Sequence, residues 1–168
     1  DGDGNTCPPG VEGEVSIGGP QTCIGTISPD GVFNDERAQR IRSGDLAIMD
    51  DDGFVAVTGR TKDLIIRGGI NIAPLEIDNV LMSHPKVREA AAIGVPDAIY
   101  GEAVVCYVVT KTGESLDAGQ VIGHCSECLP DFKRPREVYF IDELPKSGRG
   151  KVMRDDLKEL WAKDHGAG

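Results

Sequence analysis

The amino-acid sequence predicts an α+β fold, because β-prone runs, tight-turn signals and helical periodicity occur together in one chain. Residues 90–95 and 103–110 are apolar and β-prone, and a turn-like pair at 96–97 separates them, so we expect paired core strands. Three other segments repeat apolar residues every three to four positions, which is typical of amphipathic helices.

The early part of the chain predicts short β-structure. Residues 14–17 alternate in polarity as a strand does. Residues 46–49 and 54–57 flank the turn-forming residues 50–53 and predict a β-hairpin. Two strands alone are marginally stable in water, so this hairpin is expected to need a partner.

A second hairpin is predicted further along. Residues 64–67 and 70–72 are β-prone and flank Gly68-Gly69, a pair that suits a tight turn between strands. Residues 138–141 predict one more strand.

The three helices follow from their start and stop signals. Pro74 suits a first helical position, and Pro85 stops the run. Asp117 followed by Gln120 resembles a capping box, and Asp155-Asp156 favour a third helix start. The residues expected to face the core are Ile77, Val80, Leu81 and His84, then Val121, Ile122, Cys125 and Leu129, then Leu157, Leu160 and Trp161.

Composition and charge narrow the function classes. A chain of 168 residues fits one domain, or a small domain with a piece of another. The formal charge of -10 argues against nucleic-acid or anionic-membrane binding, which needs a basic field. No apolar run approaches the roughly 20 residues that span a bilayer, and residues 1–10 lack the features of a secretory signal, so a cytoplasmic protein is expected.

Neither the cysteines nor the histidines predict a metal site. The five cysteines are irregularly spaced and fit a reducing compartment. Cys125 and Cys128 form a C-x-x-C that closes a helix and has no second ligand pair, so they are expected to be structural. Residues 1–12 approach a calcium loop but lack its required glycine, and His84 and His124 are isolated from other ligands, so we expect no metal.

Three segments combine glycine with basic residues: 59–63, 67–69 and 145–151. In an acidic chain such clusters are places where a phosphate can be met, although each taken alone also fits a solvated turn. The last segment is not a P-loop, because Pro145 and Val152 replace the required glycine and hydroxyl residue. It instead predicts a mobile loop that carries an extended cation.

Taken in order, these segments resemble the C-terminal region of the adenylate-forming superfamily, which includes acyl-CoA synthetases, luciferases and peptide-synthetase adenylation domains. The resemblance runs from about Gly10 to Leu160. It implies a small, mobile C-terminal domain at 62–168, with a β-hairpin and a short, mainly antiparallel sheet flanked by helices. Residues 1–61 would be β-strands left from the large N-terminal domain.

The resemblance implies nucleotide contacts and a hinge. Ser43-Gly44-Asp45-Leu46 is similar to the family's [ST]-G-D-L segment, which implies that Asp45 contacts the ribose hydroxyls of ATP. Gly59-Arg60-Thr61-Lys62-Asp63 resembles the hinge motif, which implies Arg60 near the nucleotide and Lys62 as the pivot between domains.

The resemblance also implies a CoA site. The segment 67–72 is similar to the hairpin that enters the active site for thioester formation, where the backbone of Gly68 and Gly69 lets the pantetheine arm pass. Tyr100 would line the CoA tunnel. The Phe132 and Arg134 positions match an F-K-x-P element that in some members contacts the CoA nucleotide.

The segment 145–151 resembles P-K-[ST]-x-x-G-K, whose last residue, here Lys151, is the adenylation lysine. Carboxylate attack on the α-phosphorus brings two anions together, and a cation between them stabilises the developing charge. A thiol must later use the space that Lys151 occupies, so the resemblance implies domain alternation about Lys62.

The implied function is an ATP-dependent, AMP-forming acid-CoA ligase. ATP and CoA are the expected cofactors, and Mg²⁺ is expected through an N-terminal adenylation domain that this chain lacks and needs as its partner, so the chain alone is expected to be inactive. Two alternatives stay open: a non-catalytic module that binds CoA or docks on a partner enzyme, and an adenylation domain that serves a carrier protein. The unpaired strands of residues 1–61 could also form contacts in a homodimer.

Overall fold

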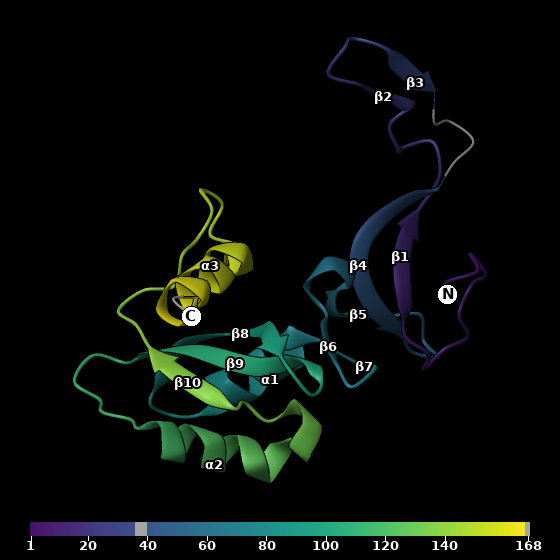
Figure 1. The fold of residues 1–168 in the computed structure, drawn as a ribbon. Coiled ribbons are helices and arrows are strands. Elements are labelled where there is room, and N and C mark those ends of the chain that lie inside the picture. The colour runs from purple at the N-terminus through teal and green to yellow at the C-terminus, as the bar shows by residue number, and fades with distance from the viewer. Residues whose placement is uncertain (36–39, 167–168) are drawn as a thin grey trace. The chain divides into compact units, whose positions relative to one another are not determined.

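A computed structural model describes residues 1–35 and 40–166. The chain divides into two compact units, Asp1–Lys62 and the remainder from Asp63 onward. Each unit has its own sheet (Figure 1).

The first unit is built on a three-stranded antiparallel sheet in the order β1-β4-β5. Its strands are β1 (Gly13–Ile17), β4 (Ile41–Met49) and β5 (Val55–Arg60). The predicted strand at 14–17 and the predicted hairpin are confirmed, and β1 is the partner that the hairpin needed. β4 begins earlier than expected, because its first half pairs with β1 rather than with β5.

The turn between β4 and β5 is held by one side chain. The Asp50 carboxylate accepts the backbone N–H groups of Asp52 at 3.0 Å and Phe54 at 2.8 Å. Gly53 has a φ of 87°, which a residue with a Cβ adopts only with strain.

The structure adds a pair of strands that the sequence did not predict, β2 (Gly25–Ile27) and β3 (Phe33–Asp35), which are antiparallel. Each strand has three residues, which is too short to show an alternating pattern in the sequence. The turn between them closes where the Ser28 N–H donates to the Val32 carbonyl at 2.9 Å.

The second unit contains a five-stranded sheet. Its strands are β6 (Ile65–Arg67), β7 (Ile70–Ile72), β8 (Val87–Asp97), β9 (Gly101–Thr110) and β10 (Glu137–Phe140). The order is β10-β9-β6-β7, and β8 lies on the other side of β9. Only the β9–β10 pair among these strands is parallel, so the prediction of a mainly antiparallel sheet is confirmed.

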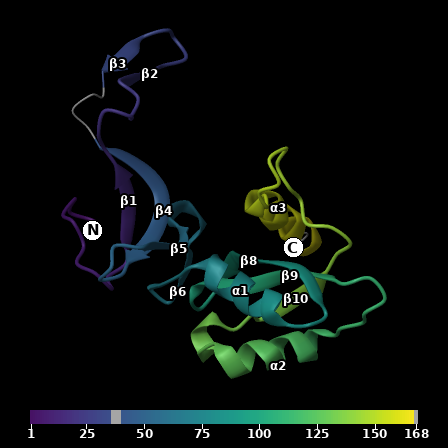
Figure 2. The same ribbon diagram turned by 180° about the vertical axis from the view of Figure 1, so that it is seen from behind.

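The helices cover both faces of this sheet. They are α1 (Pro74–Ser83), α2 (Ala118–Cys128) and α3 (Arg154–His165). Helices α1 and α2 lie on one face, and α3 lies on the other, as the view from behind also shows (Figure 2). The α+β class predicted from the sequence is therefore confirmed.

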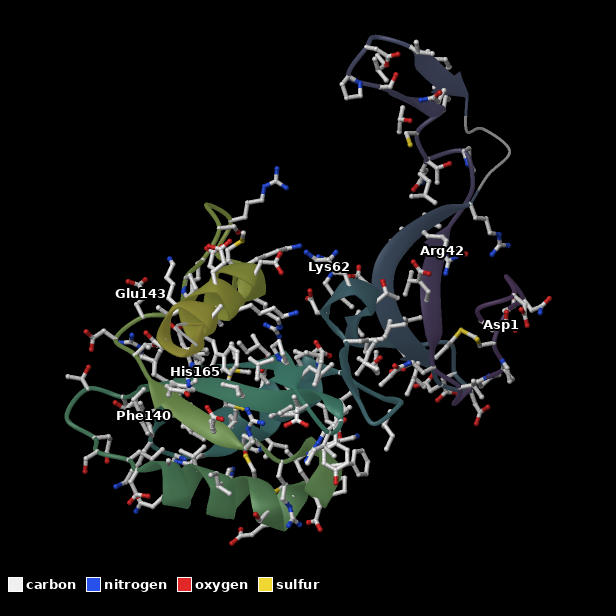
Figure 3. All side chains as sticks on the ribbon, in the orientation of Figure 1. Asp1, Arg42, Lys62, Phe140, Glu143 and His165 are labelled. Atoms are coloured by element: carbon white, nitrogen blue, oxygen red, sulfur yellow. The ribbon has the colours of Figure 1, made fainter. Side chains whose placement is uncertain are left out.

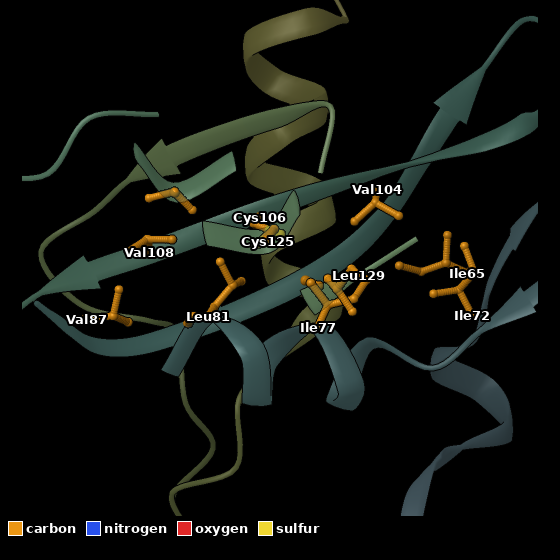
Figure 4. Close-up of a cluster of buried hydrophobic side chains, with 13 residues drawn as sticks. Ile65, Ile72, Ile77, Leu81, Val87, Val104, Cys106, Val108, Cys125 and Leu129 are labelled. Carbon is orange, nitrogen blue, oxygen red and sulfur yellow. The ribbon is translucent and has the colours of Figure 1, made fainter. Parts of the chain in front are cut away.

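β8 and β9 explain the layering, because consecutive residues contribute to opposite cores. Ala90, Ala92 and Cys106 pack with α1 and α2, as the buried cluster in Figure 4 shows in part. Ala91 and Tyr107 pack on the other face, with Leu157 of α3. Burial on both faces is the reason these strands read as continuous apolar runs.

The helix start signals are confirmed for α1 and α2. Pro74 is the first residue of α1. At the start of α2, the Asp117 carboxylate accepts the Gln120 N–H at 2.9 Å, and the Gln120 side chain accepts the Asp117 N–H at 3.1 Å. This reciprocal pair satisfies two N–H groups that would otherwise lack partners.

Several details differ from expectation. Pro96-Asp97 belong to β8, and the turn to β9 lies at residues 98–100 instead. β10 begins one residue before the predicted strand. Leu160 is 38% exposed rather than buried, since Leu157 and Trp161 are the residues of its stripe that pack against the core.

From the sequence we expected His84 and His124 to be isolated, but in the structure they contact each other. The rings of His84 and His124 meet edge to face at 5.0 Å. The Nε2 atom of His124 lies 3.0 Å from both the Val80 carbonyl and the Ser83 hydroxyl, which are groups of α1. These contacts join α1 to α2.

No helix in the described part of the chain is long and apolar enough to cross a membrane.

Candidate functional site

The first unit joins two of the predicted nucleotide residues. Asp45 and Arg60 are partners across β4 and β5, and the Arg60 Nε donates to the Asp45 carboxylate at 2.7 Å. Both side chains are more than a third exposed, so the pair is accessible to a ligand. Behind it, Gly44 has a φ of 76°, and its carbonyl accepts the Thr61 hydroxyl at 3.1 Å.

Lys62, the predicted pivot, is the last residue of the first compact unit. It lies in a short 3-10 turn, Thr61–Asp63, and its side chain is exposed (Figure 3). A residue between two compact units, in a single helical turn, can change its backbone angles without disturbing either core.

In the second unit, Gly68 and Gly69 form the tip of the β6–β7 hairpin, with φ values of 58° and 82°. Two successive residues with positive φ define the type I′ geometry that strand twist favours. A Cβ on Gly69 would meet no atom within 4 Å, whereas one on Gly68 would lie 3.5 Å from the Tyr100 ring. The glycines therefore present bare backbone at an exposed tip.

Tyr100 lies against this hairpin. Its carbonyl accepts the Gly68 N–H at 2.7 Å, and its ring lies 5.2 Å from the Arg67 guanidinium carbon. The turn that carries Tyr100 is shaped by Asp97, whose carboxylate accepts the N–H groups of Tyr100 and Ile99 at 2.8 and 3.0 Å. These hydrogen bonds hold the pKa of Asp97 below its usual value.

Phe132 reaches the same place through Arg67. The Arg67 guanidinium donates to the Phe132 carbonyl at 2.7 Å, and the Phe132 ring is 37% exposed. Tyr100 is 52% exposed. The structure thus gathers Gly68, Gly69, Tyr100 and Phe132 around Arg67, and we call these five residues the hairpin cluster.

Arg134 lies apart from that cluster in its bonding. Its guanidinium donates to the carbonyls of Leu129 at 2.9 Å and Ser126 at 3.1 Å, at the C-terminal end of α2. It also pairs with the Asp131 carboxylate. A cation here satisfies carbonyls that the helix leaves open.

Lys151 ends a tight loop before α3. Lys146 and Val152 form an antiparallel bridge, and the Ser147 N–H donates to the Lys151 carbonyl at 2.8 Å. Gly150 has a φ of 78°, which the reversal of the chain requires. Figure 3 shows Phe140 on β10 and Glu143 further along, where the chain leaves the sheet towards this loop.

The Lys151 ammonium has no bonding partner among residues 1–35 and 40–166, and the residue is exposed. Its loop stands beside α3, on the face of the sheet opposite α1 and α2 (Figures 1 and 2). The hairpin cluster lies at the far end of the sheet, where β6 pairs with β9 at Arg67 and Gly101. The predicted cation and the predicted CoA residues therefore occupy separate places on the second unit.

Residues 76–151 match the family model of the AMP-binding enzyme C-terminal domain. These residues belong to that family. In the structure, this AMP-binding enzyme C-terminal domain extends from α1 to Lys151 itself.

The curated relatives of the domain are CoA ligases. The chain is 40% identical to oxalate–CoA ligase of Saccharomyces cerevisiae over 166 residues, which are 97% of this chain and 31% of the yeast protein. It is 41% identical to a long-chain-fatty-acid–CoA ligase of Escherichia coli, over 95% of this chain and 28% of that protein. The chain thus spans about a third of the length of these relatives.

Solved structures with the same fold are adenylate-forming enzymes. ATP-bound MatB from Rhodopseudomonas palustris superposes with a TM-score of 0.80 at 34% identity, over 92% of this chain and 31% of that one. An o-succinylbenzoate CoA synthetase from Bacillus subtilis, in complex with its acyl-adenylate intermediate, gives 0.79 at 34% identity, over 93% and 32%. Two-thirds of each structure therefore has no counterpart in this chain.

Sequence reasoning missed one charged pair, which joins the matched domain at Asp78 to Arg154, three residues after Lys151. Arg154 donates to Asp78 at 2.5 Å, and Asp78 is 4% exposed. A signal was present: Pro74, Ile77, Asp78 and Leu81 share one helical stripe, and all four are buried. A carboxylate on a buried stripe indicates a partner from elsewhere in the chain.

Proposed function

We propose that this chain is the C-terminal part of an ATP-dependent, AMP-forming acid-CoA ligase and acts with an N-terminal adenylation domain. In the first step a carboxylate oxygen attacks the α-phosphorus of ATP, an O–P bond forms, and the bond to the β-phosphate breaks with release of pyrophosphate. In the second step the CoA sulfur attacks the acyl carbon, a C–S bond forms, the C–O bond breaks, and AMP leaves. The thiol proton goes to solvent.

The observation that carries this proposal is the unpartnered Lys151 at the end of a glycine-containing loop. An ammonium group that is not used by the fold is free to meet an anion supplied from outside. Placed between the carboxylate and the α-phosphate, it would offset the charge that develops as they approach. Removal of one such contact typically lowers a rate by about 10²–10³-fold.

The hairpin cluster supports the second step. Gly68 and Gly69 leave the hairpin tip without side chains, so a narrow thiol-bearing chain could run along the backbone. The half-exposed Tyr100 ring offers an apolar wall beside that path. Phe132 would extend this wall towards the CoA nucleotide. The guanidinium of Arg134 donates to carbonyls of α2 and its C-cap, so we propose that Arg134 supports CoA binding indirectly. It would do so by holding the turn at residues 131–133, which carries Phe132.

The separation of Lys151 from the hairpin cluster supports domain alternation. Both groups belong to one compact unit, so a single active site could receive them only in turn. A rotation about Lys62 would present the Lys151 loop for adenylation and the hairpin for thioester formation. The proposal therefore assigns the hinge to the last residue of the first compact unit, at its boundary with the second.

In the first unit, Asp45 is proposed to accept the ribose hydroxyls of ATP, with Arg60 beside it. The Arg60 bond at 2.7 Å orients the carboxylate and leaves its second oxygen for a ligand. Residues 1–35 and 40–166 contain no group of three His, Cys, Asp or Glu side chains placed to hold a metal ion. Mg²⁺ is proposed to enter with ATP, on the adenylation domain.

Free CoA is the proposed acceptor, because the curated relatives named above are CoA ligases. Transfer to a carrier protein would use the same adenylation residues and differ in the surface that meets the acceptor. A non-catalytic docking module is the third alternative, and it gives no reason for an unpartnered Lys151.

The test uses the polypeptide in which this chain is joined to its adenylation domain, with ATP and either oxalate or a long-chain fatty acid, the acids of the relatives named above. Lys151→Ala should lower pyrophosphate release by about 10²-fold or more, and should leave CoA thioester formation from preformed acyl-adenylate within a few-fold of the unaltered protein. Lys163→Ala, at an exposed lysine of α3, is the matched control. Equal loss in both steps would refute the assigned role of Lys151.

A further inference from the structure

Asp78 and Arg154 form a buried ion pair between two helices. Asp78 lies on α1, and Arg154 is the first residue of α3. The Arg154 Nη2 donates to the Asp78 Oδ2 at 2.5 Å, and the side chains are 15% and 6% exposed. The other Asp78 oxygen accepts the Ala92 N–H of β8 at 2.6 Å. One carboxylate therefore joins α1, β8 and α3.

The Asp78–Arg154 pair lies at the edge of the sheet that β8 forms. β8 has β9 on one side, and α1 and α3 pack on its two faces (Figure 2). Because Arg154 reaches across this edge to α1, it fixes where α3 begins relative to the sheet.

Arg154 also lies three residues after Lys151, at the base of the Lys151 loop. The base is closed by the Met153 N–H, which donates to the Pro145 carbonyl at 2.9 Å. Because this hydrogen bond joins the two arms of the loop, a displacement of Arg154 would move Met153 and, with it, both arms.

The two arms of the loop have unequal anchors. The arm before the tip is held by Lys146, whose ammonium lies 2.7 Å from the Glu89 carboxylate of β8, and by the buried Leu144. That ion pair is about a third exposed. The arm that carries Lys151 continues directly into Arg154, whose side chain is 15% exposed, and then into the fully buried Leu157.

Stability alone does not explain a buried pair of this kind. Desolvation of two charges can exceed their mutual attraction, and apolar residues often fill such places equally well. Here burial raises the pKa of Asp78 to about 6 despite the adjacent Arg154 and the Ala92 N–H. The geometry of the pair is fixed, because the Asp78 carboxylate accepts one hydrogen bond from Arg154 and one from the Ala92 N–H. These two bonds determine the position of Arg154, and with it the start of α3.

We propose that Asp78 and Arg154 are positioning residues that set the Lys151 loop for acyl-adenylate formation, an inference that rests on the proposed function. Neither residue is a catalytic residue, because both act through the loop base and not on the substrate. Misplacement of a catalytic group by about 1 Å can lower a rate by about 10²-fold. The expected consequence of breaking the pair is a selective loss of the first step.

The anchoring itself is tested on the present chain by amide hydrogen exchange. Asp78→Asn retains the shape of the side chain and removes its charge. The N–H groups of Ser147, Gly150 and Met153 should exchange at least about 10-fold faster in this variant, while those of β9 keep their rates. Glu114→Gln, which removes the exposed partner of Lys86, is the matched control and should change neither set. Unchanged rates in the loop would overturn the proposal.

The functional consequence is tested on the polypeptide joined to its adenylation domain, with ATP and either oxalate or a long-chain fatty acid. Asp78→Asn should lower the kcat for pyrophosphate release by about 10–100-fold, with a smaller change in the KM for ATP. Thioester formation from preformed acyl-adenylate should stay within about two-fold. Equal loss in both steps would indicate simple destabilisation and would overturn the positioning role, as would no loss at all.

A second variant guards against misfolding. Arg154→Lys retains the positive charge but loses the planar geometry of the guanidinium, and it should show the same selective loss to a smaller extent. If Asp78→Asn fails to unfold cooperatively, Arg154→Lys decides the question by the same criteria. Failure of the proposed function has a different signature: Lys151→Ala would then leave pyrophosphate release intact, whatever the loop exchange rates show.

Discussion

Arg67 and Tyr100 hold the hairpin cluster together, with the guanidinium carbon 5.2 Å from the ring centroid and the neighbouring Gly68 N–H bonded to the Tyr100 carbonyl at 2.7 Å. The β6–β7 hairpin pairs with β9 at one position, Arg67 with Gly101, so these contacts are what fix it to the turn at residues 98–100. A hairpin fixed in this way keeps its glycine tip in a constant place on the domain.

Gly69→Ala should therefore impair the thioester step selectively. Gly69 has a φ of 82°, and an alanine there costs about 1–2 kcal/mol and adds a methyl group to the bare tip. We expect slower CoA thioester formation from acyl-adenylate, by about 10-fold, with pyrophosphate release near the original rate. Gly113→Ala, at a φ of 80° in a distant turn, introduces the same strain and should leave both steps unchanged. Equal effects of the two substitutions would contradict a role of the tip in the reaction.

Leu157→Ala should destabilise the second unit. Leu157 is fully buried against β8 and β9, and truncation of such a side chain leaves a cavity that costs about 2–5 kcal/mol. Leu160→Ala removes the same atoms from a side chain that is 38% exposed and should cost less than about 1 kcal/mol. Urea unfolding of both variants measures the difference, and similar losses would mean that α3 packs in another register.

The cysteines should divide by burial when they meet an alkylating reagent. Burial raises the pKa of Cys125 to about 11 and that of Cys106 well above its ordinary value, so neither forms the reactive thiolate at about pH 8. Cys23 and Cys128 are exposed. Iodoacetamide followed by peptide mass spectrometry should find these two modified first and Cys106 and Cys125 protected until the chain is unfolded. Rapid labelling of Cys125 in the folded chain would contradict the burial of its thiol.

Local signals explain what the sequence could predict. The Gly68-Gly69 turn, Pro74 and the Asp117–Gln120 capping box each specify their structure within a few residues, and all three are found as expected. Sheet assembly is different, because it depends on pairs that are distant in sequence. The pairing of Arg67 with Gly101 and the parallel course of β10 beside β9 have no local signal.

The same distinction holds for the candidate site. The sequence motifs identified Lys151, Gly69 and Tyr100 one at a time. The structure adds that Tyr100 lies against the hairpin, whereas Lys151 lies on another part of the second unit. The Asp78–Arg154 pair spans 76 residues and could not be paired from the sequence, although a carboxylate on a buried stripe was visible. Burial patterns thus indicate where a partner is needed, and the fold supplies it.

Asp78 should make the folded state less stable as the pH rises from about 4 to about 6. Burial, opposed by Arg154 and the Ala92 N–H and reinforced by Asp63, raises the pKa of Asp78 from 3.8 to about 6. A group whose pKa is raised by folding favours the folded state below its ordinary pKa, and this contribution is lost as the pH rises through the folded value. A shift of about two units corresponds to about 3 kcal/mol.

The measurement compares urea unfolding of the unaltered chain with that of Asp78→Asn at about pH 4 and about pH 7. Carboxylates such as Asp97 and Glu137, whose pKa values are lowered by hydrogen bonds, change stability in the opposite direction, but they titrate equally in both proteins. Part of this contribution is already lost at about pH 4, so the stability of the unaltered chain relative to Asp78→Asn should decrease by about 2 kcal/mol between the two pH values. A difference that stays constant, or that increases with pH, would mean that the Arg154 ion pair outweighs desolvation, and that Asp78 is ionised throughout this range.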